Sequence, residues 1–412
     1  MSNSQVHAAV LRFLLQNGYR ETQEAFVREA GDLIDFDNVE DAPPLHHLFL
    51  TRDNIDEDQQ LADRMSSLRL ERLAELEEGD NDYYTTLTDT LSEIHATHVL
   101  AVAVEPRTNM VATSSTDKSV KLTNLKNRNI ERTYRHHQAP VLSIDFHPTM
   151  PHLMLTTSMD GTSVLVDTRV HADGSGDPTA GVHQRFKDHQ KYVVRGVFSK
   201  DGQYIATASY DHSVCIYAQQ RGEEERYELV RKLDNFIGNV ETICFLSEHT
   251  LVAGVTGDNY LHYIDIDNDF ARERYNMNAN ADDWVSFSPL WISPSPDGKY
   301  LLCSTSHQSG RTILFEIHGS RQIQNYYDAP SDNQFVTRRH CWHPSGRYFY
   351  ASGGDDNCIR VIETKTGRVA ARLTGHDAMI RTMTLDPQIG LVTGGYDHLV
   401  NVWSKPIQSI IR

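Results

Sequence analysis

Long apolar runs and closely spaced cysteine pairs are both absent from this chain, and each absence excludes a class of protein. No segment approaches the roughly 18 apolar residues that a membrane-spanning helix needs. The first five residues, M-S-N-S-Q, hold neither the basic and apolar stretches of a signal peptide nor the second-position glycine of a myristoylation signal. The five cysteines among 412 residues form no C-x-x-C pair. We therefore expect reduced, mostly buried thiols in a cytoplasmic or nuclear protein.

Positive charge is scarce as well. The chain has 39 Lys and Arg residues against 56 Asp and Glu residues, which gives a formal net charge of −17. This balance argues against direct binding to a nucleic-acid backbone, because such binding needs a basic surface.

Motifs of common catalytic sites are missing too. The sequence contains no glycine-rich phosphate loop with lysine, no G-x-S-x-G elbow and no H-E-x-x-H helix. We predict no catalytic, cofactor-binding or metal-binding residues, no cofactor and no enzymatic activity.

What the sequence does contain is one short pattern in several copies. A polar turn and an aspartate precede a strand whose apolar residues stand three and five positions after the aspartate. Six copies follow one another at about 41 to 51 residues, apart from one gap of about twice that length. The gap holds a degenerate copy without the aspartate, so we count seven. The six aspartates are Asp117, Asp160, Asp211, Asp258, Asp356 and Asp397.

Histidines stand upstream of four copies, each four residues before an apolar strand start. A buried histidine there can donate a hydrogen bond to the aspartate of the neighbouring turn, and a serine two residues before the aspartate can join them. We interpret these groups as turn-stabilising residues rather than catalysts or metal ligands. The residues so assigned are His95, His137, His189, His376, Asp117, Asp160, Asp211, Asp356 and Asp397.

Between these markers the sequence predicts four short antiparallel strands per copy. The pattern resembles the WD-repeat family of β-propellers over residues 83–412. The resemblance implies an all-β seven-bladed WD-repeat propeller, a closed ring that leaves no open sheet edge. The copies are uneven, since the fourth and sixth lack the histidine. We expect residues 83–91 to supply the outer strand of the last blade.

Residues 1–36 have a helical period instead. A first helix is expected to end near Gly18, and a second over residues 21–29 should turn Ala25 and Phe26 inward. The stretch resembles the LisH motif in its paired leucines, Gly-Tyr, Thr, Ala-Phe and Glu-Ala. The resemblance implies a small N-terminal α-helical homodimerisation segment; the alternative is a hairpin folded back on the propeller. The predicted dimerisation residues are Val10, Leu11, Leu14, Leu15, Tyr19 and Phe26.

Residues 37–82 are predicted to be an acidic linker with a helix over residues 55–78. Three roles stay open for this segment: an extension of the dimer, part of a longer domain after LisH, or a solvated spacer.

Two groups of residues are candidates for binding partner proteins. The first consists of tyrosines and arginines beside the turn markers, residue types that are enriched in interface hot spots. Its members are Tyr192, Arg195, Tyr210, Arg381 and Tyr396.

The second group is the stretch V-D-T-R at residues 166–169. It resembles the W-D-x-R signature that docks some WD-repeat substrate receptors onto the adaptor of cullin-RING ubiquitin ligases, with Val166 in place of tryptophan. The resemblance implies docking through Asp167 and Arg169. The alternative is that the Asp–Arg pair stabilises a strand end.

The sequence thus supports a non-catalytic scaffold that dimerises and presents propellers to protein partners in a multi-subunit assembly. The first alternative is a substrate receptor of a cullin-RING or related ubiquitin ligase. The second is a propeller associated with nucleic acid through splicing or transcriptional co-repression.

Overall fold

The structure is a computed structural model that describes residues 3–16, 20–30, 39, 83–106, 108–172, 177–220, 222–327, 329–333 and 337–406. The chain divides into two compact units, residues 1–75 and 76–412. The helix predicted over residues 55–78 and the dimerisation residue Tyr19 lie outside the described residues, as does most of the acidic segment.

The first unit contains two helices, α1 (Asn3–Gln16) and α2 (Arg20–Ala30). Ala8 and Leu11 are buried, and Phe26 packs against them from the second helix. His7 stacks on the Phe26 ring, with 6.0 Å between the ring centroids. Neither described helix is long and apolar enough to cross a bilayer.

The apolar residues of α1 are divided between the interior of this unit and its surface. Leu14 is buried, whereas the Leu15 side chain is 50% exposed. The expectation that Ala25 faces inward is wrong, since it is exposed while Phe26 beside it is partly buried. One apolar side chain of the predicted dimerisation set is therefore left uncovered within this unit.

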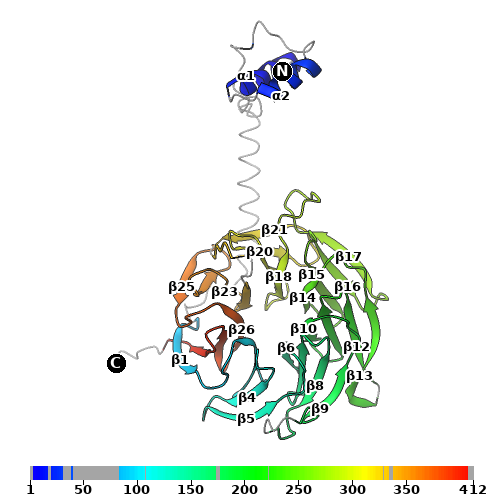
Figure 1. Cartoon of the computed structure of the whole chain (residues 1–412), viewed down its shortest axis with the longest axis vertical. Helices are drawn as coiled ribbons and strands as arrows, with labels where there is room; N and C mark the ends of the chain where they lie inside the picture. Colours follow the sequence, from blue (N-terminus) through cyan, green and yellow to red (C-terminus); the bar gives the residue numbers. More distant parts are fainter. Residues whose placement is uncertain are drawn as a thin grey trace. The chain divides into compact units, whose positions relative to one another are not determined.

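The second unit consists of seven four-stranded antiparallel sheets around a central axis (Figure 1). This confirms the predicted seven-bladed propeller. Blades one to three comprise β2 (Val99–Val104), β3 (Met110–Ser115), β4 (Val120–Asn124), β5 (Asn129–Tyr134); β6 (Val141–Phe146), β7 (Leu153–Ser158), β8 (Ser163–Asp167), β9 (Val182–Phe186); and β10 (Val193–Phe198), β11 (Tyr204–Ser209), β12 (Val214–Gln220), β13 (Glu223–Leu233). Blades four and five comprise β14 (Val240–Phe245), β15 (Thr250–Val255), β16 (Tyr260–Asp265), β17 (Ala271–Asn276); and β18 (Pro289–Pro294), β19 (Tyr300–Thr305), β20 (Arg311–Glu316), β21 (Gln322–Tyr327). Blades six and seven comprise β22 (Arg339–Trp342), β23 (Tyr348–Ser352), β24 (Ile359–Glu363), β25 (Val369–Leu373); and β26 (Ile380–Asp386), β27 (Gly390–Gly395), β28 (Val400–Ser404), β1 (Thr86–Leu91).

The hydrophobic core lies between neighbouring blades. The first strand of each blade contacts the first strand of the next around the whole ring. Between blades three and four, for example, Ala206 and Ile216 of the one pack in a single buried cluster with Ile243 and Leu251 of the other. Each blade is therefore stabilised by both of its neighbours.

Six of the seven inner strands carry a register shift at the same place, directly after the first residue pair. A β-bulge of this kind leaves one residue unpaired and redirects its side chain. Five of the six extra residues line the central channel. The extra residues are Leu100, Leu142, Val194, Glu241, Leu290 and Arg381.

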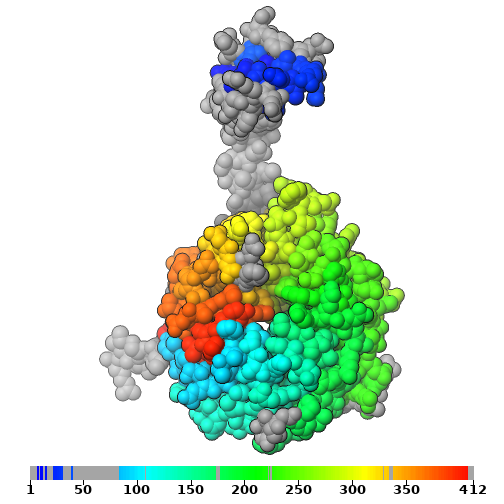
Figure 2. Space-filling view, in the orientation of Figure 1, coloured from blue at the N-terminus to red at the C-terminus, as the bar shows by residue number. Residues whose placement is uncertain are grey.

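The ring is closed by a strand from the other end of the chain. β1 pairs with β28, from Thr86 opposite Ser404 to Leu91 opposite Val400. In Figures 1 and 2 the cyan start of the propeller lies beside its red end. The outer strand expected within residues 83–91 is confirmed. Tyr84 adds a contact to blade six, since its backbone N–H donates to the Tyr350 hydroxyl at 2.8 Å.

We expect a shortened chain that begins at residue 93 to be less stable than one that begins at residue 80. Only the former loses β1, so the edge of β28 and the pocket of the buried Leu91 side chain become exposed. The melting temperature should fall by at least about 5 °C, because a loss of several kcal/mol acts on a large cooperative unit. Equal melting temperatures in scanning calorimetry would contradict closure by β1.

Candidate functional site

A chain of hydrogen bonds supports the turn in blade seven. The Trp403 indole N–H donates to Thr393 Oγ1 at 3.1 Å, and Thr393 Oγ1 lies 2.8 Å from His376 Nε2. His376 Nδ1 lies 2.8 Å from Asp397 Oδ2, which also accepts the backbone N–H of Asp377. An ionised carboxylate can only accept, so Nδ1 carries the proton and the threonine hydroxyl donates to Nε2.

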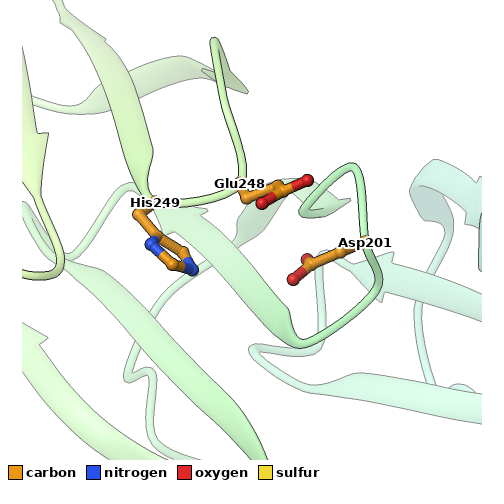
Figure 3. A group of neighbouring side chains, drawn as sticks. All are labelled: Asp201, Glu248 and His249. Carbon is orange, nitrogen blue, oxygen red and sulfur yellow. The ribbon is translucent and has the colours of Figure 1, made fainter.

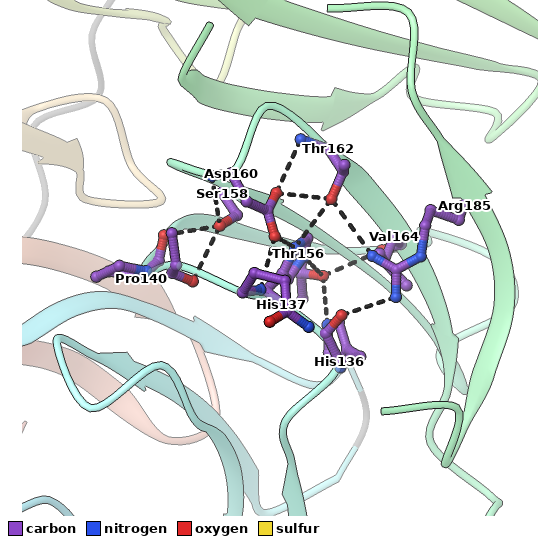
Figure 4. A network of polar contacts seen from close by, with 11 residues as sticks. His136, His137, Pro140, Thr156, Ser158, Asp160, Thr162, Val164 and Arg185 are labelled. Carbon is purple, nitrogen blue, oxygen red and sulfur yellow. Dashed lines mark hydrogen bonds and ion pairs between the residues drawn. The ribbon is translucent and has the colours of Figure 1, made fainter. Parts of the chain in front are cut away.

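Blades one, two and three contain the same histidine–aspartate–threonine arrangement. The imidazole Nδ1 lies 3.1, 2.9 and 3.1 Å from the carboxylate in the pairs His95–Asp117, His137–Asp160 and His189–Asp211. The imidazole Nε2 in each case lies within 3.0 Å of a buried threonine hydroxyl. Figure 4 shows the blade-two network, in which Arg185 from the outer strand adds a bond to the His136 carbonyl at 2.7 Å. The threonines were missed in the sequence because strands are rich in threonine throughout.

The carboxylates of these turns are held in the ionised form. Burial alone raises the pKa of Asp211, but hydrogen bonds from His189 and Ser213 outweigh it, so its pKa lies well below the usual range. The same causes depress the pKa of Asp117 and Asp160. Hydrogen bonds of this kind fix the turn and the register of the strands beside it.

Blades four and six lack the upstream histidine and use another residue in its place. Asp258 pairs with His262 at 2.7 Å, and Asp356 pairs with Arg360 at 2.6 Å. Both partners stand four residues after the aspartate, on the following strand. A basic residue four positions after a turn aspartate was therefore the signal available in the sequence.

The central channel contains a cavity of about 530 Å³ lined by the inner strands. Four of the five predicted partner-binding residues line it: Tyr192, Arg195, Tyr210 and Arg381. Tyr396 does not, and packs instead against His98 with ring centroids 4.7 Å apart.

Arg195 does not project from the rim as the sequence suggested, because it stacks within the channel. Its guanidinium carbon lies 3.6 Å from the centroid of a Trp291 ring, and that of Arg339 lies 4.5 Å from the Trp291 ring. Trp291 and Arg339 were missed because blades five and six lack the full set of markers. Guanidinium groups stacked on an indole gain cation–π attraction while leaving their N–H groups at the edges.

The acidic groups of the channel accept hydrogen bonds from neighbouring residues. The Tyr210 hydroxyl donates to Glu241 at 2.8 Å, and the Phe198 backbone N–H donates to Asp145 at 2.9 Å. Burial raises the pKa of Asp145 to about 6, despite that hydrogen bond. His340 also lines the channel, and burial lowers its pKa to about 3, so it is neutral.

The Asp167–Arg169 pair lies at the end of β8. Arg169 makes a bidentate contact, with Nε at 3.0 Å and Nη2 at 2.8 Å from the two Asp167 oxygens. Its Nη2 also lies 3.5 Å from Glu225 on β13. The Arg169 side chain is 59% exposed. Arg169 thus links the end of β8 in blade two to β13 in blade three, and part of its guanidinium remains exposed to solvent.

One group in the described part of the chain has the residue types of a metal site: Asp201, Glu248 and His249, from turns of adjacent blades (Figure 3). Two of its three members already have partners within the fold. Asp201 accepts from the Ser199 hydroxyl at 2.6 Å, and His249 Nδ1 lies 2.7 Å from Asp267. We therefore assign it to turn structure.

Replacement of Asp211 by alanine should destabilise the propeller by about 2 to 3 kcal/mol at neutral pH, since it leaves buried donors without an acceptor. The folded pKa of Asp211 lies below its unfolded value, so its contribution is present above about pH 4 and is lost as the pH falls further. Urea unfolding at pH 7 and pH 3 should show the difference between wild type and variant shrinking at the lower pH. Glu228→Gln, at an exposed site on an outer strand, is the control.

Comparison with known proteins agrees with this architecture. A family model described as "WD domain, G-beta repeat" matches residues 86–124, 128–167, 181–218, 329–363 and 367–404. Four of the matches begin at or just before the outer strand of a blade, β1, β5, β9 or β25, and the match over residues 329–363 begins before the inner strand β22. Every match ends within the third strand of the blade that follows. Residues 219–328, where the markers are least complete, lie between the matches.

The relatives are distant. They include Protein hir1 of Schizosaccharomyces pombe, 22% identical over 307 residues that cover 66% of this chain and 32% of hir1. Nuclear distribution protein PAC1 of Komagataella phaffii is 25% identical over 227 residues, 48% of this chain and 41% of PAC1. Transcriptional corepressor LEUNIG_HOMOLOG of Arabidopsis thaliana is 27% identical over 184 residues, 42% of this chain and 20% of the relative. The chain thus spans between about a fifth and two fifths of the length of these relatives. The chain carries WD40 repeats over the matched residues and folds as a seven-bladed β-propeller.

Proposed function

We propose that the protein is a non-catalytic scaffold that dimerises through its N-terminal helices and presents the channel mouth of each propeller to a protein partner. The observation that carries this proposal is the gathering of tyrosine and arginine side chains from several blades at one opening of a rigid ring. These are the residue types that dominate binding energy at protein interfaces.

Two features of the mouth favour a protein as the partner. The Tyr192 side chain is 45% exposed and lies beside Tyr210, with ring centroids 6.2 Å apart. Such an aromatic pair offers a large contact area with little conformational freedom to lose. Tyr192 and Tyr210 also stand directly beside the ends of β10 and β11 rather than within long loops, so little of the chain has to be ordered on binding.

Dimerisation would place two such mouths in one particle. A partner with two recognition segments would then bind the second at a high effective concentration. The N-terminal unit supports this role because a second copy of its helices would cover the exposed Leu15 side chain. The names of PAC1 and LEUNIG_HOMOLOG place relatives in nuclear distribution and transcriptional co-repression. We include in the proposal a location in the cytoplasm or nucleus and an assembly of that general kind.

The dimer hypothesis predicts that Leu15→Glu converts a dimeric full-length chain into a monomer. A buried charge at the interface would cost several kcal/mol, enough to raise the dimer dissociation constant at least about 100-fold. Sedimentation equilibrium over a range of concentrations measures it.

The matched control is Arg28→Gln on α2, which makes the same change in net charge at an exposed position. A wild-type chain that stays monomeric at high concentration would eliminate dimerisation, and the hairpin would then serve another purpose.

A second candidate is a substrate receptor of a ubiquitin ligase, favoured by the exposed part of the Arg169 guanidinium. It predicts that affinity purification of the wild-type chain recovers cullin-ligase subunits and that Arg169→Ala loses them. The scaffold proposal predicts the same partner assembly from both forms. Mass spectrometry of the two purifications in parallel distinguishes the two functions.

A further inference from the structure

The channel holds two arginine side chains that form no ion pair within the described ranges. Neither Arg195 nor Arg381 forms a hydrogen bond or ion pair with any residue of the described ranges, and the Nε of Arg195 is buried from solvent without an acceptor. Burial lowers the pKa of Arg195 to about 10; the Asp145 carboxylate opposes this lowering, and Arg381 adds to it. Arg195 remains charged at neutral pH, so its buried Nε–H donor is left unsatisfied at an energetic cost.

A third arginine adds to this charge. Arg339 is buried and donates only to backbone carbonyls, those of Arg338 at 3.0 Å and Leu290 at 3.4 Å. Its pKa is lowered well below the usual value, first by burial and then by Arg381. The three guanidinium groups come from the inner strands of blades three, six and seven. They therefore converge across the channel from separate parts of the sequence.

The charge of this cavity has the opposite sign to that of the protein. The charged side chains that line it are three arginines against Asp145 and Glu241, an excess of one positive charge. The whole chain carries −17. Because low-dielectric walls concentrate the field of such a cluster, an anion is attracted to the channel although the outer surface repels it.

We propose that the mouth of the central channel binds an acidic peptide segment of a partner protein, with one aspartate or glutamate carboxylate received by Arg195 and Arg381. This inference rests on the scaffold function proposed above and names the chemistry of its partner. The planar fork of a guanidinium matches a carboxylate by two parallel hydrogen bonds. Trp291 and the Tyr192–Tyr210 pair supply the apolar wall for the neighbouring residues of the peptide.

Charge balance favours a carboxylate over a phosphate. A single carboxylate neutralises the excess of one positive charge, whereas a doubly charged phosphate would leave a net negative charge in a partly buried cavity. Nucleic acid is disfavoured because its backbone would be repelled by a chain with a net charge of −17.

The test uses the full-length chain and fluorescein-labelled hexaglutamate, followed by fluorescence anisotropy, with hexaglutamine as the neutral peptide. Hexaglutamate should bind at least about tenfold more tightly than hexaglutamine, as expected for one charge-assisted hydrogen-bonded pair. Arg381→Gln, on the bulge at the start of β26, should weaken hexaglutamate binding by about 10- to 30-fold. Arg195→Lys keeps the positive charge but loses the planar guanidinium that can form two parallel hydrogen bonds. It should weaken hexaglutamate binding by less than Arg381→Gln does.

The matched control is Arg368→Gln, which makes the same change in net charge at a side chain that is 70% exposed outside the channel. Its affinity for hexaglutamate should stay within about twofold of wild type, because exposed charges are screened by solvent. The melting temperature of each variant shows whether it is folded. If Arg381→Gln is not folded, the test depends on Arg195→Lys and on the quenching of wild-type tryptophan fluorescence by hexaglutamate.

Three results would overturn the proposal: equal binding of hexaglutamate and hexaglutamine, equal losses in Arg381→Gln and Arg368→Gln, or tighter binding of hexa-phosphoserine or hexauridylate than of hexaglutamate. The scaffold function is judged separately by affinity purification. If protein partners are recovered but hexaglutamate does not bind, the ligand chemistry is wrong and the scaffold stands. If no protein partner is recovered with the wild type, the scaffold function itself fails.

Discussion

The pairing of β1 with β28 is the contact on which the rest of the propeller depends. Six blades can form from consecutive strands, but the seventh needs one strand from the start of the domain, some 300 residues away in the chain. Without it, β28 would expose a row of unpaired backbone groups, and the last blade would lose its cover on the outer side. Closure also explains why the inner strands can surround a stable channel. Each inner strand is supported by a neighbour on both sides, so no blade can tilt away without breaking two interfaces.

Within this ring, the inter-blade clusters and the turn networks stabilise the fold in different ways. The clusters supply the hydrophobic free energy, because nearly all apolar strand residues are buried between blades. The histidine–aspartate pairs add geometric definition, since a buried polar chain tolerates only one arrangement of its donors and acceptors. Blades four and six reach the same result with His262 and Arg360, which shows that the position of a basic group matters more than the strand that supplies it.

The channel differs from these clusters and turn networks in its unpaired charged side chains. Arg195 and Arg381 are brought together without an acceptor, although the sheet could have placed apolar residues there, as it does at the bulges Leu100, Leu142 and Val194. Unsatisfied buried donors oppose folding, and an arrangement of this kind is usually retained for binding. The bulge after the first pair of β26 directs the Arg381 side chain to the channel.

The sequence by itself determined the number of blades, the turn aspartates and the closing strand, because each repeat carries its own hydrophobic period and turn residues over about 40 positions. It also singled out Arg195 and Arg381, since they stand next to the strand starts that the histidines mark. Only the tertiary structure decided what these residues do. Arg195 and Arg381 meet Trp291, Glu241 and Arg339 across the axis, and these partners come from blades whose markers are degenerate. Their meeting depends on ring closure and on the bulges in six of the seven inner strands, which are set by long-range packing and leave no local pattern in the chain.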